Sequence, residues 1–424
     1  MPRRLAMKFQ LCWLLVSLFA GASHAAETRW YKGNLHTHTL WSDGDDYPEN
    51  IVSWYRDQGY NFLALSDHNV LLEGTKWVTI TNTPKREMAF RRYVEAFGSN
   101  WVFLRTGEGK RQVRLKTLTE FRPLFEEPGR FLLIPSEELS DKYKSIPIHL
   151  NVSNVRDRIP EQGGSNVLDV IQRSINAVLR QQKEAARPML VHVNHPNFGW
   201  AIPAEVLMQV KGDRFFEVYN GHAGVNNKGD KYHANTERIW DIILTFRLTE
   251  LGLPPMFGLA VDDSHEYFTR GPSNHNSGRG WIMVRAANLT PGALFAAMEA
   301  GDFYASTGVR LADIKRDSGG IALRIEPEPG VTYNTQFIGT RKGFDPTSEA
   351  GEQPTNSVQA VTRQYSKDIG AILAEAPGES PSYHCKGDEI YVRAKVISSK
   401  KRTFPHPPQE NEVAWVQPVA PKPD

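Results

Sequence analysis

The chain has 424 residues, of which 40% are hydrophobic and 23% are charged, and this composition excludes intrinsic disorder, collagen and coiled coils. Lys and Arg total 50 against 48 for Asp and Glu; without the basic Arg3, Arg4 and Lys8 near the start, the balance is 47 minus 48, or −1. Such a balance gives no electrostatic footprint for nucleic acid or an anionic membrane. Because single cores stop growing at roughly 250 to 300 residues, we expect one large domain and a smaller one.

Residues 1–25 are typical of a secretory signal peptide. A basic start precedes an apolar stretch at residues 11–19, and the small residues Ser23 and Ala25 stand at positions −3 and −1 of a cleavage site. The apolar stretch is well short of the ~20 residues of a membrane-spanning helix, so we expect cleavage and export to the periplasm or the exterior, with no membrane span left. Cleavage removes Cys12 and leaves Cys385 alone, so we expect no disulfide, and any metal must bind nitrogen and oxygen ligands.

Seven short apolar runs follow, and each turns polar at its C-terminal end. Runs of this kind are typical of strands buried on both faces, which are usually parallel and covered by helices. Helical patterns lie between several of them, at residues 49–58, 167–182 and 236–252. The alternation predicts an α/β fold, a seven-stranded β/α barrel whose site lies at the carboxyl ends of its strands. The runs cover residues 33–38, 61–68, 131–138, 148–154, 189–196, 215–222 and 256–265.

An insertion at about residues 74–130 interrupts the barrel pattern and predicts a lid or wall. Its interspersed basic and acidic residues favour a solvated face, and a basic rim that attracts a phosphorylated substrate is the alternative. A strand at residues 281–284 and a helix ending near residue 300 complete the predicted barrel domain, residues 26–308. Beyond it, short alternating runs among Gly, Pro and Ser predict an antiparallel β-rich domain over residues 309–424. Its expected strands cover residues 321–325, 335–338, 358–361 and 390–397, with an extended Pro-rich end from Pro405.

Histidine and acidic residues gather where the predicted strands end. His36 and His38 face the same side of one strand, so two imidazoles can converge on one ion, and Asp43 follows in a glycine-containing turn. A single strand histidine such as His149 is more often a hydrogen-bonded core residue. Burying so many charges and imidazoles together would be costly without a metal, and this favours a metal site.

These motifs, in this order over roughly residues 30–285, resemble those of the PHP superfamily, the polymerase and histidinol phosphatase proteins. The resemblance implies a distorted seven-stranded, TIM-like barrel with two or three divalent ions, which are zinc, manganese or iron. The motifs are Leu35-His-Thr-His38 through Gly44, Ser66-Asp-His68-Asn69, Pro135-Ser-Glu-Glu138, His149, His195-Pro196 and Asp263-Ser-His265. The implied ligands are His36, His38, Glu138 and Asp263 for one ion, Glu138, His149 and His195 for a second, and Asp43, His68 and His265 for a third.

Glu138 is preferred over Glu137 as the ligand because it precedes Leu139-Ser140, as the family's ligand does. Clustered divalent ions can lower the pKa of a bridging water to give hydroxide near neutral pH, and can hold phosphoryl oxygens. We therefore expect a metal-dependent phosphoesterase that hydrolyses a small phosphorylated compound by attack of a metal-bound hydroxide. Two alternatives stay open: hydrolysis of a non-phosphate ester, lactone or amide, and a non-enzymatic exported binding protein with structural metals.

Further polar residues surround the expected ligands. His222 could protonate a leaving alkoxide or orient a ligand, and Arg270 could clamp a phosphate or lie solvated in its loop. Substrate-binding or ligand-supporting roles are expected for Asn69, His192, Asn194, Asn197, Asn220 and Arg279. Ordinary surface positions are expected for His233, His275, His384 and His406.

Overall fold

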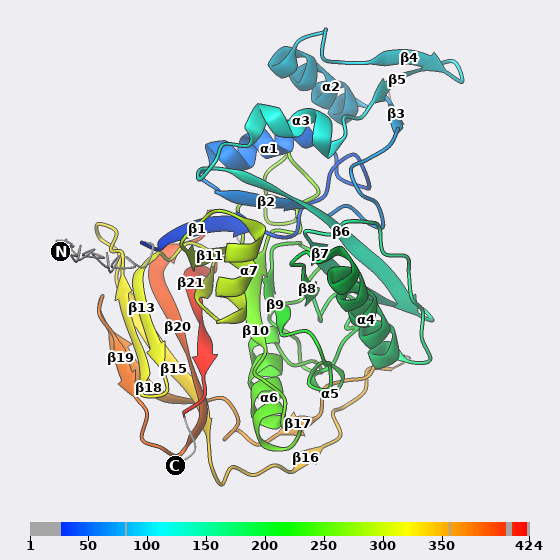
Figure 1. Ribbon diagram of the computed structural model, residues 1–424. Helices are drawn as coiled ribbons and strands as arrows, with labels where there is room; N and C mark the ends of the chain where they lie inside the picture. The colour runs from blue at the N-terminus through cyan, green and yellow to red at the C-terminus, as the bar shows by residue number, and fades with distance from the viewer. Residues whose placement is uncertain (1–26, 81–82, 356–357, 404–408, 422–424) are drawn as a thin grey trace, which may run out of the picture.

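The computed structural model describes residues 27–80, 83–355, 358–403 and 409–421, and Figure 1 shows their arrangement. The expected signal peptide lies outside the described residues. Within the described part of the chain, no helix combines the length and apolar character that crossing a membrane requires. The fold is a mixed α/β structure built on one 13-stranded sheet.

The seven predicted strands are consecutive neighbours in the large sheet. Four of the pairings are parallel, as predicted. The prediction is wrong for the fourth strand, which runs antiparallel to both neighbours because Lys144, at φ 56°, turns the chain back within two residues. The sheet order is β10 (Phe257–Val261), β9 (Phe215–Asn220), β8 (Leu190–Val193), β7 (Ile146–Ser153), β6 (Leu132–Tyr143), β2 (Phe62–Leu65) and β1 (Arg29–Asn34).

Strands β1 and β10, at the two ends of this set, approach each other only beyond their carboxyl ends. There, Thr37 and Ser264 form an isolated parallel bridge, and the Asp263 N–H donates to the carbonyl of His36 at 3.0 Å. The carboxyl ends are thereby gathered into a ring, but no strand-to-strand pairing of β1 with β10 closes it among the described residues. A closed seven-stranded barrel is therefore not confirmed.

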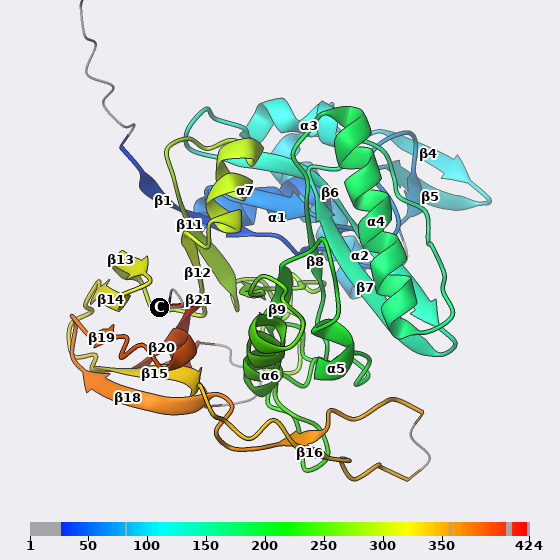
Figure 2. The same ribbon diagram turned by 60° about the horizontal axis from the view of Figure 1, so that its bottom comes forward.

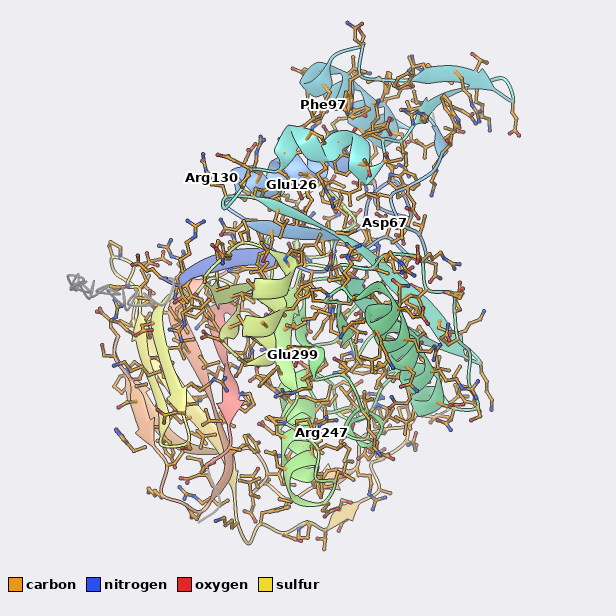
Figure 3. All side chains as sticks on the ribbon, viewed as in Figure 1. Asp67, Phe97, Glu126, Arg130, Arg247 and Glu299 are labelled. Atoms are coloured by element: carbon orange, nitrogen blue, oxygen red, sulfur yellow. The ribbon has the colours of Figure 1, made fainter. Side chains whose placement is uncertain are left out.

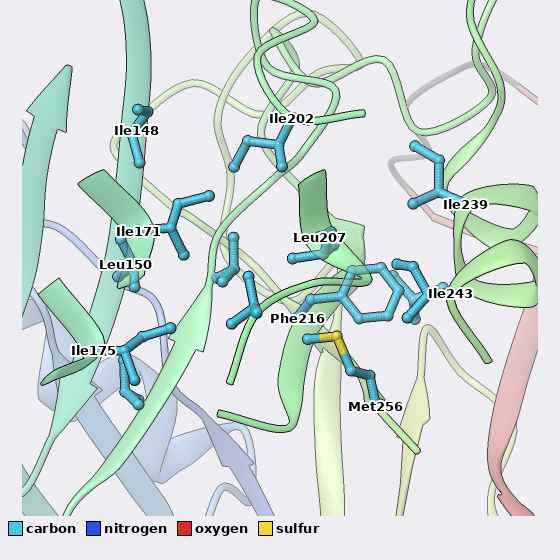
Figure 4. Packing of buried hydrophobic residues seen from close by; sticks show 14 of the residues in the cluster. Ile148, Leu150, Ile171, Ile175, Ile202, Leu207, Phe216, Ile239, Ile243 and Met256 are labelled. Carbon is cyan, nitrogen blue, oxygen red and sulfur yellow. The ribbon is translucent and has the colours of Figure 1, made fainter. Parts of the chain in front are cut away.

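Helices cover the parallel part of the sheet where the sequence predicts them. α1 (Pro48–Asp57) begins with Pro48 in its first turn and ends before Gly59, whose φ of 75° suits glycine. α4 (Val167–Ala185) and α6 (Thr236–Thr249) pack against β7 and β9. Figure 4 shows their buried apolar faces meeting, with Ile148 and Leu150 of β7, Ile171 and Ile175 of α4, Leu207 of α5 (Ala204–Leu207), Phe216 of β9, and Ile239 and Ile243 of α6.

The predicted insertion projects from the sheet beside α1 (Figures 1 and 2). A three-stranded sheet in the order β3-β5-β4 lies beside two helices, and its central strand contains Val113. A capping box between Thr117 and Glu120 begins the second helix. The elements are β3 (Trp77–Thr79), α2 (Pro84–Phe97), β4 (Leu104–Gly107), β5 (Lys110–Arg114) and α3 (Leu118–Phe125).

Six C-terminal strands continue the same large sheet, antiparallel throughout, in the order β1-β11-β12-β21-β20-β15-β18, whereas β13, β14 and β19 form a separate three-stranded sheet and β16 pairs with β17. The strand predicted at residues 358–361 is wrong, since these residues form a loop and Val358 is 70% exposed. Within the C-terminal stretch that is expected to be extended, residues Asn411–Val419 form strand β21, which lies between β12 and β20 in the large sheet. The elements are β11 (Trp281–Ala286), α7 (Pro291–Glu299), β12 (Phe303–Ser306), β13 (Leu311–Asp317), β14 (Gly320–Ile325), β15 (Tyr333–Arg341), β16 (Ser348–Glu349), β17 (Gln364–Tyr365), β18 (Ala371–Pro377), β19 (Ser382–His384), β20 (Glu389–Lys401) and β21 (Asn411–Val419).

Candidate metal centre

The nine side chains expected to bind metal come together at the ring of strand ends. They divide among clusters of three or four side chains whose possible ligand atoms all lie within 4.8 Å of one another. Asp67, labelled in Figure 3, lies at the end of β2 directly before His68. The expected ligands are His36 and His38 after β1, Asp43 in the next turn, His68 after β2, Glu138 in β6, His149 in β7, His195 after β8, and Asp263 and His265 after β10.

The carboxylate of Glu138 occupies the centre of the cluster, with a side chain that is 1% exposed. Five imidazoles surround it. The neighbouring Glu137 is directed elsewhere, since its Oε1 accepts the N–H of Ile159 at 2.6 Å. The distances to Glu138 are 3.4 Å from His36 Nε2, 3.3 Å from His38 Nε2, 2.8 Å from His68 Nδ1, 3.1 Å from His149 Nδ1 and 3.5 Å from His195 Nε2.

The donor atoms of the cluster fit a divalent cation. The Nε2 atoms of His36 and His38 lie 3.1 Å apart, and each lies 3.2 Å from Asp263 Oδ1. Glu138 Oε2 and His149 Nδ1 are buried without a hydrogen-bond partner among the described residues. When the imidazoles are neutral, their lone pairs repel the carboxylate oxygens that they face, and a cation between them removes this repulsion. Nitrogen and carboxylate ligands of this kind suit zinc, manganese or iron.

A second part of the cluster opens toward solvent at Asp43, whose side chain is 54% exposed. Its carboxylate oxygens lie 3.4 Å from His265 Nε2 and 3.5 Å from His68 Nε2. His265 Nδ1 lies 3.0 Å from the carbonyl oxygen of Asp263. That contact makes Nδ1 the donor, so in the neutral ring the lone pair lies on Nε2, toward Asp43. The partly exposed side of the centre is where a substrate can reach it.

Burial and charge oppose each other throughout the cluster. Burial alone would raise the pKa of Glu138, but the histidines around it, His68 foremost, hold that pKa well below its usual value. Burial would lower the pKa of His36, but the carboxylates of Asp263 and Glu217 raise it well above its usual value. Burial would raise the pKa of Asp263, yet His36 and His38 keep it well below the usual range. Both carboxylates are therefore ionised at neutral pH, the state in which they bind metal.

Glu217 of β9 is a supporting residue that the sequence analysis did not single out. Fully buried, it lies behind His36, whose Nδ1 is 2.7 Å from Glu217 Oε1. His192 Nε2 contacts the same oxygen at 3.1 Å. The other oxygen accepts the backbone N–H of His195 at 2.7 Å and the Asn220 amide at 2.8 Å. A carboxylate on Nδ1 fixes the ring of His36 and directs Nε2 to the centre.

Two further buried carboxylates hold the loops that carry the ligands. Asp67 accepts hydrogen bonds from the backbone and hydroxyl of Thr39 and from Ser42, fixing the turn before Asp43. Asp262 accepts three consecutive backbone N–H groups, of residues 278–280, at 2.6 to 2.8 Å. Each stands directly before an expected ligand, Asp67 before His68 and Asp262 before Asp263. This position in the sequence is the signal that could have identified both carboxylates as supporting residues.

The expected supporting residues act mainly on other protein groups. Asn194 donates to Glu138 Oε1 at 2.7 Å, and Asn220 donates to Asp263 Oδ2 at 3.0 Å. Asn69 pairs with the backbone of Ser140, and the Asn197 amide donates to the carbonyls of residues 226 and 234. His192 is fully buried on Glu217, which places it behind the ligands and away from substrate.

His222 stacks on His275, with ring centroids 3.6 Å apart. His222 Nδ1 accepts the N–H of Gly224, and His275 Nδ1 accepts the N–H of Ala223. Each ring thus has its proton on Nε2 and can donate from there. Burial lowers the pKa of His222 to about 3, against the opposing charge of Asp263, so it is a neutral donor at neutral pH. The surface position expected for His275 is wrong, because its loop folds back over His222.

The two arginines expected to clamp a phosphate are not brought to the metal centre. Arg270 donates to the carbonyl of Ser277, and Arg279 donates to the carbonyls of Gly221 and Gly271. Both line a pocket that contains none of the nine expected ligands. His233 is also not a surface residue, since it is 9% exposed and stacks on Trp200 at 3.9 Å. His384 is exposed as expected, and His406 lies outside the described residues.

No family model and no curated protein matches the chain. Among solved structures, a two-domain protein from Bacteroides vulgatus containing a predicted PHP-like metal-dependent phosphoesterase is 12% identical, covers 92% of this chain and 95% of its own, and has a TM-score of 0.38. A proposed metal-dependent phosphoesterase from Bifidobacterium adolescentis is 12% identical over 55% of this chain and 87% of its own, at a TM-score of 0.30. An amidohydrolase from Chromobacterium violaceum, with sulfate bound and no metal, is 11% identical over 56% of this chain and 88% of its own, at 0.27. The solved structures that this chain matches thus include one with a predicted PHP-like metal-dependent phosphoesterase and one that is a proposed metal-dependent phosphoesterase.

Proposed function

We propose that this protein is a PHP-type, metal-dependent phosphoesterase that hydrolyses a small phosphorylated compound. The observation that carries the proposal is the convergence of five imidazoles on the carboxylate of Glu138, with Asp43 and Asp263 beside them. Two or three divalent ions held by these ligands would supply a coordinated water of lowered pKa and would neutralise the charge of a phosphoryl group. A charged phosphoryl group is the substrate part that such a concentration of cations binds best.

The chain's own residues prepare the centre for this reaction. Glu217 holds the His36 ring from behind, and Asn194 and Asn220 hold the carboxylates of Glu138 and Asp263. These contacts fix the ligand geometry before substrate arrives, so little reorganisation is needed during reaction. We assign His222 the role of a hydrogen-bond donor, in place of an imidazolium that would protonate the leaving alkoxide. As a neutral imidazole, its Nε2–H can donate a hydrogen bond to a substrate oxygen.

The experiment that tests the function measures metal content and turnover in one preparation. The purified protein, loaded in turn with zinc, manganese and iron, is assayed on phosphomonoesters, phosphodiesters, carboxylic esters, a lactone and an amide. We expect turnover of phosphate esters alone. Turnover of the carboxylic substrates alone would identify the protein as another kind of hydrolase. Bound metal with no turnover of any substrate would favour the non-enzymatic binding protein.

A pair of histidine variants distinguishes loss of the metal ligands from a general effect of replacing a histidine. His38→Ala removes an imidazole that faces both Glu138 and Asp263, and we expect loss of bound metal and of turnover. His384→Ala changes an exposed histidine of β19 and leaves both unchanged. Equal activity of the two variants would contradict the proposal.

Export of the protein is a separate proposal that rests on the residues at the chain's start. The basic start, the apolar stretch and Ala25 at the cleavage position support it. Fractionation of the native host with N-terminal sequencing of the mature protein tests it. We expect the periplasmic or secreted fraction and a first residue of Ala26, whereas a cytoplasmic protein that begins at Met1 would contradict export.

A further inference from the structure

The loop that carries His275 also forms one wall of a second pocket. This pocket has a volume of about 490 Å³, which is in the range of small-molecule sites at roughly 300–1,000 Å³. Residues 277–279 of the loop line it together with Lys32 of β1 and Trp54 of α1. Arg402, which follows β20, and Glu412 of β21 complete the lining, so the pocket lies between the parallel and the antiparallel parts of the sheet.

The described lining carries an excess of positive charge, with three arginines and one lysine against the single acid Glu412. Arg402 is paired with Glu410 at 2.5 Å. Neither Lys32 nor Arg279 forms an ion pair with a carboxylate among the described residues. Arg279 is instead held by the backbone carbonyls of Gly221 and Gly271. The charge on this side of the pocket is therefore not neutralised by a direct ion pair, although the charge of Asp262 acts on both residues.

Lys32 is held in the pocket by aromatic rings. Its Nζ lies 3.9 Å from the ring centroid of Tyr60 and 4.2 Å from that of Trp281. Burial lowers the pKa of Lys32 to about 8, partly offset by the charge of Asp262, so the side chain is mostly protonated at neutral pH. Its Nζ also donates to the carbonyl of Gln58 at 3.4 Å, and the ammonium group has further N–H donors for an anion.

Three hydrogen-bond donors of residues in the lining have no acceptor within the part of the chain that the structure describes. Tyr60 OH, Ser277 Oγ and Arg279 Nε are buried and have no hydrogen-bond partner among the described residues, and the three residues are only 2%, 3% and 3% exposed. Buried polar groups in native proteins nearly always have partners, and leaving a donor without one costs free energy. All three residues line the same pocket, and rotation of their side chains would bring the donors to one ligand there.

We propose that this pocket binds the phosphate group of a small phosphorylated molecule, at a site separate from the metal centre. A phosphate offers several acceptor oxygens and up to two negative charges, which matches the unpartnered donors together with Lys32 and Arg279. The pocket exceeds a bare phosphate in size, and the rings of Trp54 and Trp281 provide apolar surface for the organic part of the ligand. The assignment does not depend on metal chemistry.

Isothermal titration with phenylphosphonate tests the site, because this probe carries a phosphate-like group that is not an ester. The full chain is titrated in a Glu138→Gln background, which is expected to lose most bound metal, so that the metal centre contributes little to binding. We expect binding to persist there. Absence of binding in this background would overturn the proposal, and because no turnover is measured, the result is independent of the phosphoesterase assignment.

Variants of the pocket identify the residues that hold the probe. Lys32→Gln removes one charge and is expected to weaken binding about tenfold or more, whereas Lys32→Arg retains it. Lys211→Gln, a change at an exposed lysine near a different pocket, is the matched control and leaves affinity unchanged. Ser277→Ala removes an unpartnered hydroxyl, so it weakens binding several-fold without lowering the thermal unfolding temperature. Equal affinity of the Lys32→Gln and Lys211→Gln proteins would overturn the proposal.

Discussion

Replacement of Glu217 by Gln perturbs the contact that holds His36 in place. The Glu217 carboxylate is fully buried and is contacted by two imidazoles, a backbone N–H and a side-chain amide, at 2.7 to 3.1 Å. Gln has the same size but only one oxygen. Whichever way the amide points, its NH₂ group faces donors that contacted an oxygen in the native protein.

The expected losses follow from these contacts. Loss of a carboxylate that supports a metal-binding histidine typically costs 10–100-fold in metal affinity, or about 1.4 to 2.7 kcal/mol. At least one buried donor also loses its acceptor, and this lowers the free energy of unfolding of the metal-free protein by about 1–3 kcal/mol. The two effects are separable because the second requires no metal.

Zinc affinity is measured by competition with a chelating dye, and stability by urea unfolding after removal of metal. Glu250→Gln, at the exposed end of α6, is the matched control and is expected to change neither value. Wild-type zinc affinity in Glu217→Gln protein would refute the conclusion that this carboxylate positions His36.

Three further predictions follow from single contacts. Glu138→Gln should lose most bound metal while Glu137→Gln retains it, as measured by elemental analysis, and equal metal content would contradict the central position of Glu138. Burial raises the pKa of Asp46 to about 7 from 3.8, so its ionised form is destabilising, and the stability present below pH 4 is lost as pH rises through 7. Asp46→Asn should therefore gain up to about 4 kcal/mol in unfolding free energy relative to wild type between pH 4 and pH 8; parallel pH profiles in urea unfolding would refute this. Arg393→Met leaves Asp241 buried without its bidentate partner at 2.7 Å, so we expect a loss of about 3–5 kcal/mol in urea unfolding, and a loss below about 1 kcal/mol would show that the pair is unimportant.

The sequence predicts the place of the candidate metal centre because most expected ligands stand at or just after the end of an apolar run. His149 stands near the start of its run and reaches the same edge because β7 is reversed. Parallel strands bring their carboxyl ends to one edge, so residues far apart in the chain meet there. The reversal of β7 is not visible in this pattern. The apolar run that predicts β6 stops at Glu138, but the strand continues to Tyr143 through polar residues that pair with the start of β7. A pattern of apolar runs therefore does not predict this hairpin.

The supporting contacts were harder to predict than the ligands. Glu217 lies within a strand of otherwise apolar character, and nothing in the sequence indicates which imidazole its carboxylate meets. His275 lies in a loop of Gly, Asn and Ser whose course depends on Asp262, which accepts the backbone N–H groups of residues 278–280. A role that depends on the path of a loop, or on which ring nitrogen carries the proton, can be assigned only from the three-dimensional structure. The same is true of the two arginines that the loop directs to the second pocket.

The continuous sheet gives the C-terminal part a direct bearing on the metal centre. β1, which leads into His36, pairs with β11 over five residue pairs, and β12 then pairs with β21 from the far end of the chain. A chain ending at residue 308, the predicted boundary, would leave β12 without that neighbour and would expose Asp241, whose partners Tyr391 and Arg393 lie on β20. We expect this shortened chain to lose cooperative unfolding and metal binding together, as measured by urea unfolding and elemental analysis. If it unfolds cooperatively and retains metal, the antiparallel strands are a separable appendage. If both are lost, the two parts of the sheet fold as one unit, and the strand that carries the first two ligands is held from both sides.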